Sequence, residues 1–217
     1  VLYKKFGLDK NAIYLLIGLA LTFVTLTIPI QFEGNLITIF WAAEVVLLFW
    51  LSQKSKISSF KLGAIIIQVL MVISLLMDWE LYSYDEALPI IFNPLFISGL
   101  MVSASFFLVH LLLKKEESLS TKYFSVEIKL YKGLILVVAF IVSYFTGILE
   151  VNYQAYQLLE NAASAFSFSV TYHFVFVAIF LFVASTLKKD IITKGILGIS
   201  IVSIIGYIAY FYKLPKN

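Results

Sequence analysis

The sequence of 217 residues contains no cysteine and no arginine. Without cysteine the chain can form no disulfide, no thiolate nucleophile and no cysteine-based zinc or iron–sulfur site. All 16 basic residues are lysines, which disfavours bidentate clamps on phosphate or carboxylate, although lysine still binds either group as a point charge. The net charge of +3 is small and the lysines are dispersed, so we expect no nucleic-acid partner.

Charge of either sign is scarce. Charged residues make up 13% of the chain, hydrophobic residues make up 61%, and the mean hydropathy is +0.97. The charged share is about half that of ordinary soluble domains. A soluble protein of this length could not bury so much apolar surface, so we expect the lipid bilayer to be its solvent and main partner.

Seven continuous apolar runs each have roughly the 17–25 residues that a helix needs to cross a bilayer. Backbone polar groups in lipid must be satisfied within the segment, which favours helices. The sequence therefore predicts an all-α, polytopic transmembrane bundle that forms a single domain over residues 1–217. The predicted spans are residues 11–30, 36–52, 62–79, 95–113, 131–149, 168–187 and 191–211.

Lysines occupy alternate connections between these runs. They precede the first run and lie between the second and third, the fourth and fifth, and the sixth and seventh runs, whereas residues 31–35, 80–94 and 150–167 contain none. By the positive-inside rule the N-terminus and the lysine-bearing connections are cytoplasmic. Only Lys213 and Lys216, after the last run, depart from this pattern.

The lysine-free connections carry acids, amides and aromatic residues. Two interpretations of them stay open: an aromatic belt with a solvated acidic rim, or a vestibule for a cation or a polyhydroxylated ligand. In residues 151–168 apolar side chains recur at mostly helical spacing, which predicts an amphipathic helix lying on the outer membrane surface. The acids concerned are Asp78, Glu80, Asp85, Glu86, Glu150 and Glu160.

Glu44 is the main chemical anomaly, because it is a carboxylic acid near the middle of the second run. At 1.5 Å per residue it lies roughly 12 Å from either end of the span. A carboxylate facing lipid at that depth costs roughly 2.5–3.5 kcal/mol, so Glu44 should face the bundle, be protonated, or both. The indole of Trp41, one turn away, could donate to it. The expected partners on other helices are Gln68, Ser103, Ser105, Ser143, Tyr144 and His173.

Two roles for Glu44 remain open: a protonated group that holds a neighbouring helix, or a proton-titrating or ligand-contacting site. His173, near the outer end of the sixth run, is either a hydrogen-bonded core residue or a ligand. The two histidines have no HxxxH, HxH or HExxH spacing. No nucleophile elbow, Walker loop or dinucleotide-binding turn occurs either, so we predict no metal and no cofactor.

The segment Leu19–Leu51, with its IPIQFEG turn followed by WAAEVVLLFW, resembles the DUF2339 family of predicted bacterial polytopic membrane proteins, a domain of unknown function. Family members carry a similar turn followed by a WALEGALLLWLG span. The segment Pro89–Leu100 is similar to a family motif centred on an asparagine, which maps onto Asn93. Glu33 replaces the usual aspartate and Val45 the usual glycine.

The resemblance covers about the first half of the chain. Because family members are far longer, it implies a C-terminal portion of a larger membrane protein in the bacterial cytoplasmic (inner) membrane, with the rest of that chain or other membrane subunits as partners. The family has no established activity, so the resemblance bears on identity and not on mechanism.

Two function classes follow. The first is a non-enzymatic envelope protein, either a transporter-like module or a scaffold, with Glu44 and Trp41 at a buried proton or ligand site and Gln31, Glu33 and Asn93 at its outer mouth. The second is a membrane-embedded transferase for lipid-linked sugars or acyl chains at the outer face. Its base or metal ligand would be Asp78, Glu80, Asp85, Glu86 or His173. The missing arginines and the lack of a paired acid–base motif favour the first class.

Overall fold

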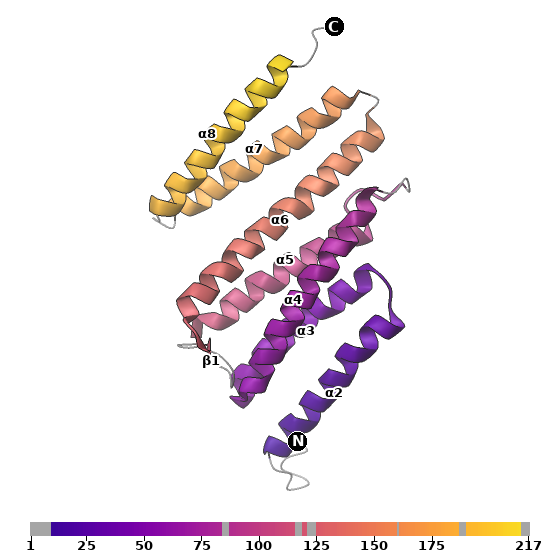
Figure 1. Ribbon diagram of the computed structural model, residues 1–217, viewed down its shortest axis with the longest axis vertical. Coiled ribbons are helices and arrows are strands. Elements are labelled where there is room, and N and C mark those ends of the chain that lie inside the picture. Colours follow the sequence, from indigo (N-terminus) through magenta and orange to yellow (C-terminus); the bar gives the residue numbers. More distant parts are fainter. Residues whose placement is uncertain are drawn as a thin grey trace. The chain divides into compact units, whose positions relative to one another are not determined.

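The computed structural model describes residues 10–83, 87–115, 119–120, 125–159, 161–186 and 190–213 (Figure 1). Helices dominate these residues, so the predicted all-α bundle is confirmed. The long helices are α2 (Lys10–Gln31), α3 (Asn35–Ser55), α4 (Ser58–Glu80), α5 (Pro94–Leu112), α6 (Ile128–Leu158), α7 (Ala162–Thr186) and α8 (Asp190–Lys213). Short 3₁₀ turns, η1 (Leu81–Ser83) and η2 (Leu113–Lys115), follow α4 and α5, and β1 (Leu119–Ser120) pairs antiparallel with β2 (Ser125–Val126).

Six of the described helices, α2 to α7, are long and apolar enough to cross a membrane. The chain is therefore a multi-pass membrane protein. The apolar part of α8, Lys194–Ala209, is shorter than these six segments. Most helix ends lie within a few residues of the predicted spans, but α6 continues to Leu158, whereas its predicted span ended at Leu149.

The chain divides into two compact units, Val1–Thr146 and Gly147–Asn217. The first unit contains α2 to α5 and most of α6, and the second contains the end of α6 with α7 and α8. The single helical domain expected from the sequence stays a prediction, because a division by contacts does not establish whether the units fold separately.

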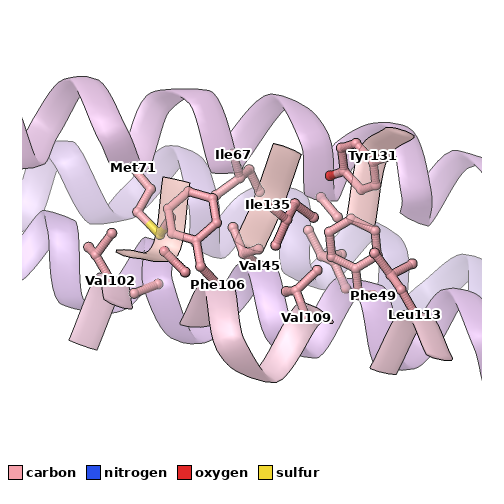
Figure 2. Packing of buried hydrophobic residues seen from close by; sticks show 14 of the residues in the cluster. Val45, Phe49, Ile67, Met71, Val102, Phe106, Val109, Leu113, Tyr131 and Ile135 are labelled. Carbon is pink, nitrogen blue, oxygen red and sulfur yellow. The ribbon is translucent and has the colours of Figure 1, made fainter. Parts of the chain in front are cut away.

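In the first unit α3 is the central helix, since it packs against α4 and α5 and less extensively against α2. Its inward residues Val45 and Phe49 are almost fully buried. Figure 2 shows them among side chains of the neighbouring helices: Ile67 and Met71 from α4, Val102, Phe106 and Val109 from α5, Leu113 from η2, and Tyr131 and Ile135 from α6. Dispersion and close packing within this cluster stabilise the unit, since lipid tails are as apolar as the residues themselves.

Successive helices of the first unit run in opposite directions (Figure 1). Helices α2 and α4 end, and α3 and α5 begin, at one end of the unit, whereas α3 and α5 end, and α4 and α6 begin, at the other (Figure 1). We call the first the acidic end, after Glu33, Asp78 and Glu80. The second is the lysine end, after Lys54 and Lys56. The segregation of charge in the sequence therefore becomes a segregation between the two ends of the unit.

Specific residues set the helix ends. Gly34, the N-cap of α3, has φ 56° and ψ −134°, a conformation that side chains with a Cβ strongly disfavour, and it permits the three-residue turn after α2. Asn93 caps α5: its Oδ1 accepts from the backbone N–H of Phe96 at 2.8 Å, and Pro94 occupies the first helical position. Lys56 ends α3 in the left-handed conformation.

The predicted surface helix over residues 151–168 is wrong. Its first half is the end of α6 and its second half is the start of α7. Tyr153 and Ala155 on the end of α6 are buried, whereas Leu158 and Phe168 of the predicted stripe are exposed, so the segment does not present one continuous apolar face. Asn161 begins α7 by accepting from the backbone N–H of Ala163 at 2.8 Å.

Candidate functional site

Glu44 lies on the face of α3 that is turned toward α2. Its side chain is 6% exposed. Oε1 is hydrogen-bonded to the hydroxyl of Thr25 on α2. None of the partners expected from the sequence makes this contact, and that expectation was wrong. Gln68, for example, accepts from the phenol of Tyr131 at 2.7 Å, so it faces α6 instead.

Thr25 could have been found from the sequence. A turn of three residues makes α2 and α3 antiparallel neighbours, so residues at similar distances from the turn lie opposite each other. Thr25 precedes Gly34 by about as many residues as Glu44 follows it. The sequence analysis did not count residues outward from Gly34 on both sides of the turn. That count, together with a threonine in an otherwise apolar run, would have indicated Thr25 as the partner of Glu44.

The hydroxyl of Thr25 serves two oxygen atoms. It lies 2.8 Å from the carbonyl oxygen of Leu21 on its own helix and also meets Oε1 of Glu44. A threonine hydroxyl has only one proton to donate. A protonated Glu44 satisfies both contacts, because its carboxyl O–H donates to Thr25 while Thr25 donates to Leu21. This arrangement favours a neutral carboxyl group, as expected for an acid at this depth.

The second oxygen of Glu44 is different. Oε2 is buried, and within the described residues it has no hydrogen-bond partner. The indole nitrogen of Trp41 also lacks a partner among those residues, and it does not donate to Glu44. A buried acceptor without a donor costs about 1–3 kcal/mol, so Oε2 is a position where a ligand donor would be favourable.

Glu44 lines a groove of about 660 Å³ between α2, α3 and α4. The groove begins at the lysine end, beside Tyr14 and Ile57, and extends along the helices to Thr25 and Glu44. The distance from Tyr14 to Thr25 along α2 is roughly 16 Å at 1.5 Å per residue, about half of the hydrocarbon layer. Glu44 is therefore the polar group at the deep end of a mostly apolar groove.

The residues predicted at an outer mouth do not belong to this groove. Gln31 and Glu33 are exposed at the acidic end, around the α2–α3 turn. Asn93 is fully buried, and its amide also donates to the carbonyl oxygen of Pro89 at 3.1 Å. Asn93 is thus a structural cap, and the groove extends from Glu44 toward the lysine end, away from Asn93.

His173 lies on α7 in the second unit, where it is half-buried. Its ring centroid is 5.5 Å from that of Phe174. Asp85 and Glu86, also predicted as candidate acids, lie outside the described residues. Glu80 is exposed at the acidic end.

Asp78 is the second buried acid of the first unit, so the solvated rim, one of the two interpretations left open by the sequence, does not apply to this residue. The side chain is 3% exposed. Its Oδ2 accepts from Thr38 on α3 at 2.6 Å, and Ser98 on α5 is a further hydrogen-bond partner. Thr38 also lies 2.6 Å from the hydroxyl oxygen of Ser74. These hydroxyl groups join the acidic ends of α3, α4 and α5, a structural role that the sequence analysis missed.

The two buried acids of the first unit, Glu44 and Asp78, thus differ in their hydrogen-bond partners. Asp78 is enclosed by hydroxyl groups of adjacent helices, whereas Glu44 has one contact and an open acceptor beside a groove. No family model, no curated protein and no solved structure matches this chain.

Proposed function

We propose that this multi-pass membrane protein is a transporter-like module in which Glu44 is an exchangeable proton and ligand site. One observation carries the proposal: the buried Oε2 of Glu44 has no partner within the described residues, and Glu44 lines a groove. A scaffold carboxyl group would be expected to be engaged by several neighbouring helices, as Asp78 is engaged by Thr38 of α3 and Ser98 of α5.

We also propose the bacterial cytoplasmic membrane as the location, with the lysine end inside. The distribution of lysines among the connections supports this orientation. Membership in the DUF2339 family is part of the same proposal, and its support is the resemblance of Leu19–Leu51 and Pro89–Leu100 to family motifs. The groove then lies in the cytoplasmic half of the bilayer, within reach of a lipid-soluble ligand.

The transferase alternative has no comparable support. Asp78 is engaged by hydroxyl groups, and the described residues contain no group of three or more acids or histidines that could hold a metal ion.

The test uses dicyclohexylcarbodiimide, an apolar reagent that modifies protonated carboxyl groups. The protein would be reconstituted in liposomes, treated at several pH values and analysed by peptide mass spectrometry. We expect modification of Glu44 that declines as pH rises, because the reactive protonated form is lost. Asp78 should be modified far less, since hydroxyl groups enclose it.

Two variants control for access and for folding. Glu44→Gln should abolish the modification. Gly63→Leu should slow it by filling the groove, because a Cβ at Gly63 would lie 3.8 Å from Leu48 and a longer side chain would extend into the space. Gly133→Leu is the matched control, since a Cβ there meets no described atom within 4 Å. An unmodified Glu44 at every pH, in protein whose Gln variant folds equally well, would end the proposal.

A further inference from the structure

The described side chains that line the groove include an acid and no base. Among its described lining residues Glu44 is the only acid, and none is Lys or His. Hydroxyl groups come from Tyr14, Thr22 and Thr25 on α2 and from Ser59 at the start of α4. Tyr14 is the other titratable group that faces the groove, and the remaining lining residues are apolar or glycine. Such a surface is complementary to a ligand that combines an apolar body with one positive charge.

The position of the carboxyl group determines where that charge would lie. Oε1 is occupied by Thr25, so the open acceptor is Oε2. A neutral donor could bond to Oε2 without changing the charge of Glu44. A cationic N–H donor would form a charge-assisted bond, about twice as strong as a neutral one, if Glu44 were ionised. In an apolar groove this difference favours the cation.

Building on the proposed function, we propose that the groove binds a lipophilic ammonium ion that carries at least one N–H, and that binding releases the Glu44 proton. The protonated carboxyl group loses H⁺ to water, and the resulting carboxylate accepts from the ammonium N–H. The charge of the site stays balanced, because one cation replaces one proton. Thr25 stays hydrogen-bonded to Glu44 in both states. It accepts from the carboxyl O–H when Glu44 is protonated, and it donates to the carboxylate when the ammonium ion is bound.

The dimensions of the groove agree with this ligand class. A volume of about 660 Å³ lies within the 300–1,000 Å³ typical of small-molecule sites. The apolar walls from Leu15, Leu19, Leu48 and Phe60 would contact an alkyl or ring system, with the ammonium group at the deep end. The ligand would thus lie parallel to the helices, in the half of the bilayer next to the lysine end.

The experiment compares three probes that share one alkyl chain. N,N-dimethyldodecylamine, protonated, has a charge and one N–H; dodecyltrimethylammonium has the charge and no N–H; 1-dodecanol is neutral. Each would be added to the reconstituted protein before dicyclohexylcarbodiimide, at fixed buffered pH, and the rate of Glu44 modification measured. In a second, weakly buffered sample a pH dye would report proton release on addition of the amine as its ammonium salt.

We expect the tertiary ammonium to slow Glu44 modification at least about tenfold more than the quaternary ion, since only the tertiary ion can form the charge-assisted hydrogen bond. Proton release should accompany its binding and be absent in Glu44→Gln. Gly63→Leu, which keeps Glu44, should lose the protection and the release together. Gly133→Leu should keep both.

Equal protection by all three probes would overturn the inference, because the alkyl chain alone would then explain binding. Protection by none of them, with Glu44 still modified in a pH-dependent manner, would overturn the inference and leave the proposed function standing. An unmodified Glu44 at every pH in the absence of any probe would instead overturn the proposed function on which the inference rests.

Discussion

The hydroxyl group of Thr38 should be a main stabilising contact at the acidic end of the first unit. Thr38 is fully buried on α3 and donates to Asp78 of α4 at 2.6 Å. It also lies 2.6 Å from the hydroxyl oxygen of Ser74. Thr38→Val keeps the shape of the side chain but removes the hydroxyl, so a buried carboxyl oxygen loses a donor and a buried serine loses a partner.

The size of the effect follows from these two losses. Leaving a buried polar group unsatisfied costs about 1–3 kcal/mol, and interhelical hydrogen bonds measured within membranes reach about 1.7 kcal/mol. We therefore expect Thr38→Val to lower the free energy of unfolding by about 1.5 kcal/mol. Ser103→Ala is the matched control, because Ser103 is also buried but its hydroxyl donates to the carbonyl oxygen of Gly99 in its own helix, at 2.9 Å. Loss of the Ser103 hydroxyl should lower the free energy of unfolding by about 0.5 kcal/mol or less.

The measurement is reversible unfolding of both variants and the parent in lipid bicelles, followed by circular dichroism. If Thr38→Val and Ser103→Ala reduce the stability equally, within about 0.4 kcal/mol, the hydroxyl network does not hold α3 to α4 and the reasoning is refuted. A large loss in Thr38→Val alone would support a structural role for Asp78, in contrast to the exchangeable role proposed for Glu44.

Three further predictions can be checked in the same unfolding assay. Gly99→Ala should cost about 1–3 kcal/mol, because its Cβ would overlap the buried side chain of Thr146; Thr146→Ala should restore part of the loss, and Gly133→Ala should have little effect. Gly34→Ala should cost about 1–3 kcal/mol, because φ 56° with ψ −134° is strained for alanine; stability equal to the parent would mean that the turn adopts another conformation. Asn93→Ala should cost about 1 kcal/mol through loss of the α5 cap, and an unchanged midpoint would contradict that role.

The helices could be predicted closely because the membrane imposes a simple rule. Backbone groups in lipid must bond within their own segment, so a long apolar run becomes a helix whatever surrounds it. The prediction failed where that rule does not apply. The end of α6, around Tyr153, is polar enough to resemble a separate surface helix, yet it continues the transmembrane helix, with Tyr153 and Ala155 buried.

The candidate site could be predicted only in part. Glu44 stands out because a carboxyl group in the middle of an apolar run is chemically unusual, whereas Thr25 does not, since threonine is common in transmembrane helices and often bonds to its own backbone, as it also does here. The burial of Asp78 could not be predicted from its position in the sequence. Its position next to a connection indicates solvent, but rotation about the helix axis turns it inward, toward Thr38 and Ser98.

The sequence by itself therefore determined the all-helical class, the membrane as solvent, the approximate limits of the spans and the presence of one anomalous acid, because each of these depends on local composition. Only the tertiary structure decided which face of each helix is buried. A helix such as α3 is apolar on nearly all sides, so no amphipathic stripe indicates its inner face, and packing against α2, α4 and α5 supplies that information. This packing gives Glu44 a threonine on one oxygen and a groove beside the other, and encloses Asp78 among hydroxyl groups.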